Sequence, residues 1–261
     1  MYQALEAGSL FPKHPMLFGH RGCSKAAPEN TIPAFEKILQ HRIPGVELDV
    51  RRCKSGELVL THDSNLLRVT GLDALVTEVD FQTIRSLDCG SWFSPDYAGE
   101  RIPLLDDVLD LLGGKVIIDI EIKHWERECG EMERMVAEII RKRNLQDSVM
   151  ISSFNPWALK AVRSADPGII LALIYTDYKE FPNWLSRGAG RYLSRPELLK
   201  PNRLKVNEEL ILQEHTYRGY PLVTWTEDDP KVIRHFLDIG INGVITNVPE
   251  TVLPIFEERW G

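Results

Sequence analysis

Short apolar runs rich in β-branched residues alternate with amphipathic segments along most of this sequence. Such runs are typical of buried parallel strands, and amphipathic segments are typical of the helices that cover them. The alternation predicts an α/β fold, a TIM (β/α)8 barrel of eight parallel strands. The predicted strands span residues 16–19, 45–50, 116–122, 148–152, 169–174, 204–206, 221–225 and 243–245. The predicted helices span residues 31–41, 104–112, 131–142, 156–163, 207–218 and 231–239.

The alternation is interrupted after the second predicted strand. A turn signal at 55–56 precedes a short hairpin segment that ends at His62. We predict that residues 52–101 form a small subdomain inserted after the second strand, because the strand–helix repeat is missing there. The repeat is also weak within 175–203. Since a barrel of this type needs about 250 residues and no linker divides the chain, we predict one domain over 1–261.

Composition narrows the range of partners. The formal net charge is −7 and no basic stripe is visible, which argues against a nucleic-acid partner. Residues 1–8 lack a basic leader, and no run approaches the roughly 20 apolar residues of a transmembrane segment. We expect a soluble, cytoplasmic protein that acts on a small molecule. The sequence does not decide whether it forms a homo-oligomer. No Cys-x-x-Cys pair is present, so a zinc site of the usual spacing is not indicated. The cysteines are expected to be free thiols, because the chain is large and resembles a cytosolic protein: Cys23, Cys53, Cys89 and Cys129.

Acidic residues alternate with apolar ones in two predicted strands. Side chains two positions apart share a strand face, so Glu47 and Asp49 point the same way. Asp119, Glu121 and Lys123 share a face in the other strand. If the strands bring Glu47, Asp49 and Glu121 together, these carboxylates need a compensating charge. A divalent metal would supply it, and oxygen ligands suit Mg²⁺ or Ca²⁺. The alternative is that each acid pairs with a nearby Lys or Arg.

Two histidines lie at the ends of predicted strands, on the same side of the predicted barrel. His20 belongs to the sequence Gly19-His20-Arg21-Gly22, and His62 ends the hairpin. Histidine exchanges a proton near neutral pH, so two histidines that flank a phosphate suit a general base and a general acid. Arg21 offers a planar fork to phosphate oxygens, and Lys123 offers a further positive charge. The alternative for either histidine is a surface position without function.

An ordered set of short motifs resembles the glycerophosphodiester phosphodiesterase family, whose members are phospholipase C-like phosphodiesterase TIM barrels. The resemblance spans about Phe18 to Pro249, and the ordered set is specific although each piece alone is common. Its first part is Gly19-His20-Arg21-Gly22, Ala27-Pro28-Glu29-Asn30-Thr31, Glu47-Leu48-Asp49-Val50, His62-Asp63, Ile102-Pro103 and Glu121-Ile122-Lys123. Its later part is Leu87-Asp88-Cys89-Gly90-Ser91-Trp92-Phe93, Ser153-Phe154, Trp225-Thr226 and Gly243-Val244-Ile245-Thr246-Asn247.

The resemblance implies one divalent metal ion, Mg²⁺ or Ca²⁺, at the carboxyl ends of the barrel strands. It implies that Glu29 orients Arg21 or the surroundings of the metal. Asn30 opens the first helix, either as its cap or as a ligand contact. Phe154 and Trp225 would line the substrate pocket, or pack in the core instead. The remaining implied roles are metal ligands for Glu47, Asp49 and Glu121, catalysis for His20 and His62, and phosphate binding for Arg21 and Lys123.

The implied activity is metal-dependent hydrolysis of glycerophosphodiesters to glycerol 3-phosphate and an alcohol, with the two histidines as general acid and base. The sequence leaves open the alcohol, the metal, the role of each histidine, and whether water or the neighbouring glycerol hydroxyl attacks the phosphate. One alternative is a lysophospholipase D-type phosphodiesterase that acts on lysophospholipids, with Trp92 and Phe93 touching a lipid tail. The other is a non-catalytic barrel that binds a phosphorylated ligand.

Overall fold

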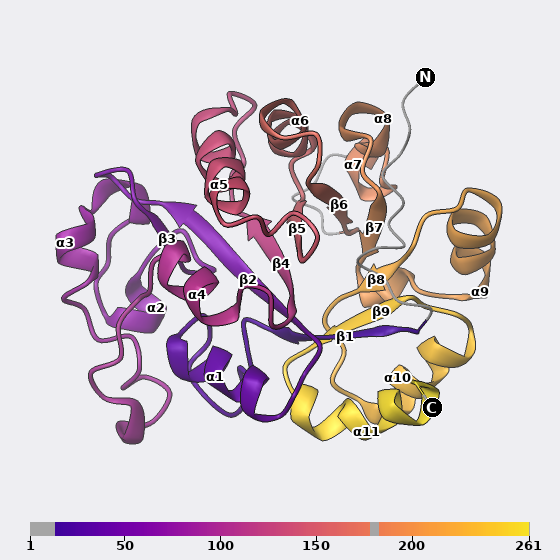
Figure 1. The fold of residues 1–261 in the computed structure, drawn as a ribbon, viewed down its shortest axis with the longest axis horizontal. Coiled ribbons are helices and arrows are strands. Elements are labelled where there is room, and N and C mark those ends of the chain that lie inside the picture. The colour runs from indigo at the N-terminus through magenta and orange to yellow at the C-terminus, as the bar shows by residue number, and fades with distance from the viewer. Residues whose placement is uncertain (1–13, 178–182, 261) are drawn as a thin grey trace.

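The computed structural model describes residues 14–177 and 183–260, and these form strands and helices in alternation (Figure 1). The strands are β1 (Met16–His20), β2 (Gly45–Arg52), β3 (Leu58–Leu60), β4 (Ile117–Ile122), β5 (Val149–Ser153), β6 (Ile170–Tyr175), β7 (Leu198–Pro201), β8 (Val223–Thr224) and β9 (Gly243–Thr246). The helices are α1 (Ile32–Gln40), α2 (Leu67–Thr70), α3 (Phe81–Ile84), α4 (Leu105–Leu112), α5 (Glu131–Lys142), α6 (Pro156–Ala165), α7 (Asn183–Ser186), α8 (Arg191–Ser194), α9 (Glu208–Leu210), α10 (Pro230–Asp238) and α11 (Pro249–Trp260).

The strands other than β3 form a nearly closed ring. Their order is β7-β6-β5-β4-β2-β1-β9-β8, and every neighbouring pair in this order is parallel. Parallel bridges from Leu199 to Leu222 and from Asn202 to Trp225 join the two ends of the ring. Helices surround the ring in Figure 1. The predicted (β/α)8 barrel is therefore confirmed for the described residues.

Alternating side chains of the strands divide the core into an inner and an outer part. In β1, Leu17 belongs to the cluster between the strands and the helices, whereas Met16 and Phe18 belong to a smaller inner cluster. The inner cluster contains Met16, Phe18, Met150, Ile170, Ala172, Leu198, Val223 and Ile245. These apolar side chains fill much of the barrel interior, so the barrel is a packed core.

The insertion follows β2 and has a core of its own. β3 pairs antiparallel with β2, which confirms the predicted hairpin, and α2 and α3 lie beside it, outside the barrel (Figure 1). A separate apolar cluster within this region includes Val59, Leu66, Ile84 and Ile102. The Tyr97 hydroxyl donates a hydrogen bond of 2.9 Å to the carbonyl of Ala26, which ties the insertion to the barrel. The domain boundary of 1–261 stays a prediction, because residues 1–13 lie outside the described part.

The predicted strand at 204–206 is wrong. The sixth barrel strand is β7, and residues 203–205 form a turn of 3-10 helix in which the Asn202 side chain accepts from the Leu204 N–H at 3.0 Å. The charged Lys200 in the middle of the true strand masks its apolar pattern. That lysine is nevertheless 1% exposed, because its ammonium group lies 3.0 Å from Ser152 Oγ and pairs with Asp119 inside the barrel.

Two helical segments also differ from expectation. The predicted helix at 207–218 is α9 followed by a π-helical segment over Ile211–Tyr217. The helix α11 was not predicted, and Pro254 inside it weakens its helical signal. None of the described helices combines the length and apolar character needed to cross a membrane.

We expect Leu199→Ala to lower the free energy of unfolding by about 2–5 kcal/mol, because this fully buried side chain of β7 packs between strands and helices. Leu204→Ala is the matched control. Leu204 is 76% exposed, so its truncation should change the free energy by no more than about 0.5 kcal/mol. Urea unfolding followed by circular dichroism measures both. A larger loss at Leu204 than at Leu199 would contradict the strand assignment.

Candidate active site

Three carboxylates meet at the carboxyl ends of β2 and β4. The parallel register places Asp49 beside Glu121, and it places His20 of β1 beside Glu47. One oxygen atom from each of Glu47, Asp49 and Glu121 lies within 4.8 Å of the others. The side chains are 1%, 0% and 7% exposed in that order. The structure thus brings the three predicted metal ligands into one buried group, called the acid cluster below.

Two cations neutralise part of the acid cluster. Arg21 Nε lies 3.2 Å from Asp49 Oδ2, and Lys123 Nζ lies 3.0 Å from Asp49 Oδ1 and 2.6 Å from Glu121 Oε1. The pairing of acids with Arg and Lys, which the sequence left open, therefore does occur. It leaves one carboxylate in excess. Glu47 Oε2 accepts from the Arg21 backbone N–H at 3.1 Å, but Glu47 Oε1 is buried without a hydrogen-bond partner among the described residues.

The carboxylates of the acid cluster differ in how readily they ionise. Burial, together with the charges of Asp49 and Glu121, raises the pKa of Glu47 well above its usual range. Burial also acts to raise the pKa of Asp49, but Lys123 and Arg21 outweigh it and hold that pKa well below its usual range. Glu47 is therefore the acid whose charge lacks compensation. The cluster fits a divalent cation, because its donors are all oxygens and one of them has no other partner.

Arg21 stands in a tight turn between β1 and α1. Its φ of 56° lies in the left-handed region, which is uncommon for a residue with a side chain and recurs at functional sites. A Cβ at Gly19 would lie 2.4 Å from Ile38 Cδ1 of α1, and a Cβ at Gly22 would lie 2.7 Å from Ala34 Cβ. The two glycines therefore let the turn pack against α1, which aims the Arg21 side chain at the acid cluster.

Ion pairs connect this turn to the insertion. Arg21 Nη1 lies 2.9 Å from Glu29 Oε1, so Glu29 contacts Arg21 as the resemblance implied. Arg68 of α2 lies 2.7 Å from Glu29 and 2.6 Å from Asp63 Oδ2. Asp63 Oδ1 in turn lies 2.8 Å from His62 Nδ1. A carboxylate oxygen can only accept a hydrogen bond, so His62 Nδ1 carries the proton. The insertion thus positions His62 and Arg21 through one shared arginine.

The last two strands of the barrel position His20. His20 Nδ1 lies 2.7 Å from Asn247 Oδ1, which follows β9. The Asn247 amide and backbone N–H groups donate to Asp228 at 2.8 Å each, which turns the amide oxygen toward His20. His20 therefore carries its proton on Nδ1, and its Nε2 faces the acid cluster 3.9 Å from Glu47 Oε2. Burial and the charge of Arg21 lower the pKa of His20 to about 3, so the ring is neutral at neutral pH.

Aromatic rings gather beside these groups. Phe154 and Trp225, the predicted pocket residues, touch edge to face with centroids 5.4 Å apart. Trp125, which follows β4, stacks on Phe154 at 5.7 Å and is 53% exposed. Trp225 also donates from its indole N–H to the Lys200 carbonyl at 3.0 Å. The three rings follow β4, β5 and β8, so they lie at the end of the barrel that carries the acid cluster.

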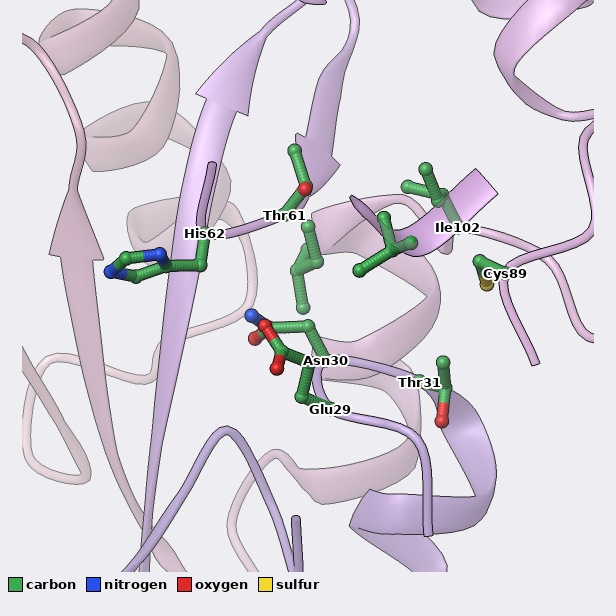
Figure 2. Close-up of a pocket in the computed structure, with 9 residues that line it drawn as sticks. Glu29, Asn30, Thr31, Thr61, His62, Cys89 and Ile102 are labelled. Carbon is green, nitrogen blue, oxygen red and sulfur yellow. The ribbon is translucent and has the colours of Figure 1, made fainter. Parts of the chain in front are cut away.

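A small pocket lies between residues 29–31 and the insertion (Figure 2). His62 stands at one end of this pocket in Figure 2, and Cys89 and Ile102 stand at the other. Its volume of ≈ 10 Å³ is about the space of one water molecule. The insertion therefore packs closely against the barrel at the point where it presents His62.

The sequence left the role of Asn30 open between a helix cap and a ligand contact, and it assigned no role to Asn247, Asp228 or Arg68. Asn30 donates to Asp49 Oδ2 at 2.8 Å and accepts from the Asp49 N–H at 3.2 Å, so it holds an acid of the cluster instead of capping α1. Asn247 and Asp228 follow β9 and β8, and a position just after a barrel strand is a signal that could have found them. Arg68 carried no such signal, because its partners become neighbours only on folding.

The sequence matches the model of the glycerophosphoryl diester phosphodiesterase family over residues 20–251. The chain belongs to this family. It is 33% identical over 239 residues to the glycerophosphodiester phosphodiesterase of Caldanaerobacter subterraneus subsp. tengcongensis, which covers 91% of this chain and 96% of that protein. It is 29% identical to the glycerophosphodiester phosphodiesterase of Bacillus altitudinis over 93% of this chain and 98% of the relative. The predicted enzyme class, glycerophosphodiester phosphodiesterase, is confirmed.

Solved structures have the same fold. A glycerophosphodiester phosphodiesterase from Thermotoga maritima superposes with a TM-score of 0.73 at 28% identity and covers 93% of this chain and 98% of its own. A phosphodiesterase from Oleispira antarctica, in complex with the product sn-glycerol-3-phosphate, superposes with a TM-score of 0.84 at 24% identity. The alignment covers 94% of this chain and 98% of the Oleispira protein.

We expect Glu47→Gln to raise the free energy of unfolding in the presence of a chelator at about pH 8. The folded-state pKa of Glu47 is raised, so its ionisation costs stability above the unfolded-state pKa near 4.5, and that cost vanishes as the pH falls to this value. The gain measured by urea unfolding should therefore disappear near pH 4.5.

Glu29→Gln serves as the control of opposite sign. Burial acts to raise the pKa of Glu29, but Arg68 and Arg21 outweigh it and lower that pKa. Its charge therefore stabilises the fold above the unfolded-state pKa, and Glu29→Gln should destabilise the protein at about pH 8. Equal signs for the two variants would contradict the electrostatics described above.

Proposed function

We propose that this enzyme hydrolyses glycerophosphodiesters to glycerol 3-phosphate and an alcohol at the acid cluster, with one Mg²⁺ or Ca²⁺ and with His20 and His62 as acid–base pair. The observation that carries this is the arrangement of both histidines, with Arg21 and Lys123, around one buried group of three carboxylates. Membership of the family supports the substrate class. The product bound to the Oleispira protein supports a small-molecule substrate.

The acid cluster is the proposed metal site. Glu47, Asp49 and Glu121 offer oxygen atoms within 4.8 Å of one another, and Glu47 Oε1 lacks a hydrogen-bond partner among the described residues. When bound, a divalent cation supplies Lewis-acid stabilisation to the phosphoryl oxygens. Arg21 and Lys123 add positive charge from the same strand ends. A phosphate held there would accept hydrogen bonds from the guanidinium fork and the ammonium group.

His20 is the proposed general base. Its Nδ1 proton is held by Asn247, and its Nε2 lone pair faces the acid cluster. Its pKa of about 3 in this structure reflects burial first and Arg21 second, which keeps the ring unprotonated and able to accept a proton. The proton would come from the attacking hydroxyl, which belongs either to water or to the glycerol moiety of the substrate.

His62 is the proposed general acid. Burial, with the charges of Lys123 and Arg21, lowers the pKa of His62, but the carboxylates of Asp49 and Asp63 oppose this and favour the protonated ring. With Nδ1 bonded to Asp63, the proton on Nε2 is the one available to the leaving alkoxide. The two histidines thus differ in what holds them, because an amide holds His20 and a carboxylate holds His62.

The aromatic rings are the proposed pocket for the substrate alcohol. Phe154 and Trp225 would line it as predicted, and the half-exposed Trp125 extends it. Trp92 and Phe93, offered in the sequence as contacts for a lipid tail, pack edge to face on each other within the insertion. Comparing the turnover of glycerophosphocholine with that of lysophosphatidylcholine separates the small substrate from the lysophospholipid alternative.

A cytoplasmic location stays a prediction, supported by the free thiols of all four cysteines.

Removal of either histidine should lower kcat by about 10²–10⁴-fold on a natural glycerophosphodiester, because each transfers a proton in the rate-limiting step. A substrate with a p-nitrophenol leaving group needs no protonation, so His62→Ala should recover most of its activity on it while His20→Ala stays impaired. His41→Ala, at an exposed histidine after α1, is the control. Recovery by His20→Ala instead would reverse the two roles, and near-normal turnover of either variant would refute the acid–base assignment.

Chelation should abolish release of glycerol 3-phosphate, and added Mg²⁺ or Ca²⁺ should restore it. Asp49→Asn removes one ligand charge, so this variant should need at least about 10-fold more metal for half-maximal activity. Asp147→Asn, at an exposed aspartate, should show the metal requirement of the unaltered enzyme. Full activity after exhaustive chelation would refute the metal site.

A further inference from the structure

A second group of potential metal ligands lies in the loop after β4 and in the first turn of α5. His124, Cys129 and Glu133 each offer one donor atom, and these atoms lie within 4.8 Å of one another. The loop begins directly after Lys123, so the group is a close neighbour in sequence of the acid cluster but shares none of its residues. It is called the His–Cys–Glu group below.

The His–Cys–Glu group is anchored by buried contacts. Glu133, in the first turn of α5, is 0% exposed and sits 2.6 Å from His124 Nδ1 through Oε1. Its other oxygen accepts from the Gly130 N–H at 2.7 Å, which fixes the carboxylate at the helix start. The donor oxygen is therefore held in place before any ion arrives.

One amide from the next strand–helix unit fixes the loop around Cys129. Asn155 Nδ2 lies 2.9 Å from the His124 carbonyl and 2.7 Å from the Glu126 carbonyl. It also lies 3.4 Å from Cys129 Sγ. Because Asn155 caps α6 through its side-chain oxygen, the loop and its sulfur are tied to a rigid part of the barrel.

The outer nitrogen of His124 has the partner that metal-binding histidines usually have. His124 Nε2 lies 3.1 Å from Glu126 Oε2, and that oxygen also accepts from the Trp125 N–H at 3.2 Å. Histidines that bind a metal through one ring nitrogen commonly donate from the other to a carboxylate, which fixes the tautomer. Nδ1 lies 2.6 Å from Glu133 and carries a proton toward it in this structure, so an ion bound here would replace that proton.

We propose that His124, Cys129 and Glu133 form a second metal site, one that takes Zn²⁺. Imidazole, thiolate and carboxylate together suit a borderline cation, whereas the all-oxygen acid cluster suits Mg²⁺ or Ca²⁺. Three protein ligands leave one position for water, and His124 also lines a cavity of ≈ 580 Å³ together with Trp125 and Glu126. Bound Zn²⁺ would fix the loop that carries Trp125 against Phe154. The inference stands independently of the proposed function.

Cobalt reports on this site, because Co²⁺ replaces Zn²⁺ and its bond to a thiolate gives charge-transfer absorption in the near ultraviolet. The full-length protein, reduced with a phosphine and saturated with Mg²⁺ to occupy the acid cluster, is titrated with Co²⁺. We expect one equivalent to produce the absorption band and Zn²⁺ to remove it. We also expect Zn²⁺ to raise the Tm of the Mg²⁺-saturated protein.

Matched variants locate the ligands. Cys129→Ser should lose the band and the Tm increase but keep Mg²⁺-dependent turnover, and His124→Gln should weaken Co²⁺ binding at least about 10-fold. Cys23→Ala is the control, because Cys23 is a buried free thiol outside the His–Cys–Glu group and its removal should leave the band intact. No band in the unaltered protein, a band that persists in Cys129→Ser, or unchanged binding in His124→Gln would overturn the site.

Discussion

The burial of three carboxylates in one cluster is the constraint on which the rest of the site depends. Glu47, Asp49 and Glu121 repel one another in a region that excludes water, and a fold that buries them needs positive charge at the same place. Arg21 and Lys123 provide it for Asp49 and Glu121 and leave Glu47 uncompensated. The residual negative charge is what suits the cluster to a cation.

Both histidines are held by segments that are remote from each other in sequence. The insertion presents His62 through Asp63 and Arg68, and Arg68 also reaches Arg21 by way of Glu29. The final strands present His20 through Asn247 and Asp228. Since an amide accepts from one ring and a carboxylate from the other, the two imidazoles occupy different electrostatic environments. The proposed division of roles between base and acid rests on these partners.

Much of the fold was predictable, because the spacing of apolar residues along the sequence and the residue types at each position indicate directly which side chains are buried. Strands such as β2 and β4 alternate acidic and apolar residues, and that period places their acids on one face. The prediction failed at β7, where Lys200 interrupts an apolar run. A lysine is ordinarily exposed, and its burial here depends on Asp119 and Ser152, which lie on other strands. No local pattern contains that information.

The sequence by itself determined the barrel, the face on which the acids lie and, through its ordered motifs, the family. These properties follow from local periodicity and from residue types at fixed spacing. Only the tertiary structure decided which cation meets which acid, that Asn30 binds Asp49, and that Asn247 orients His20. It also brought His124, Cys129 and Glu133 within reach of one ion. The reason is physical: a hydrogen bond or ion pair requires contact at about 3 Å, and the contacts between distant segments exist only once the barrel has closed.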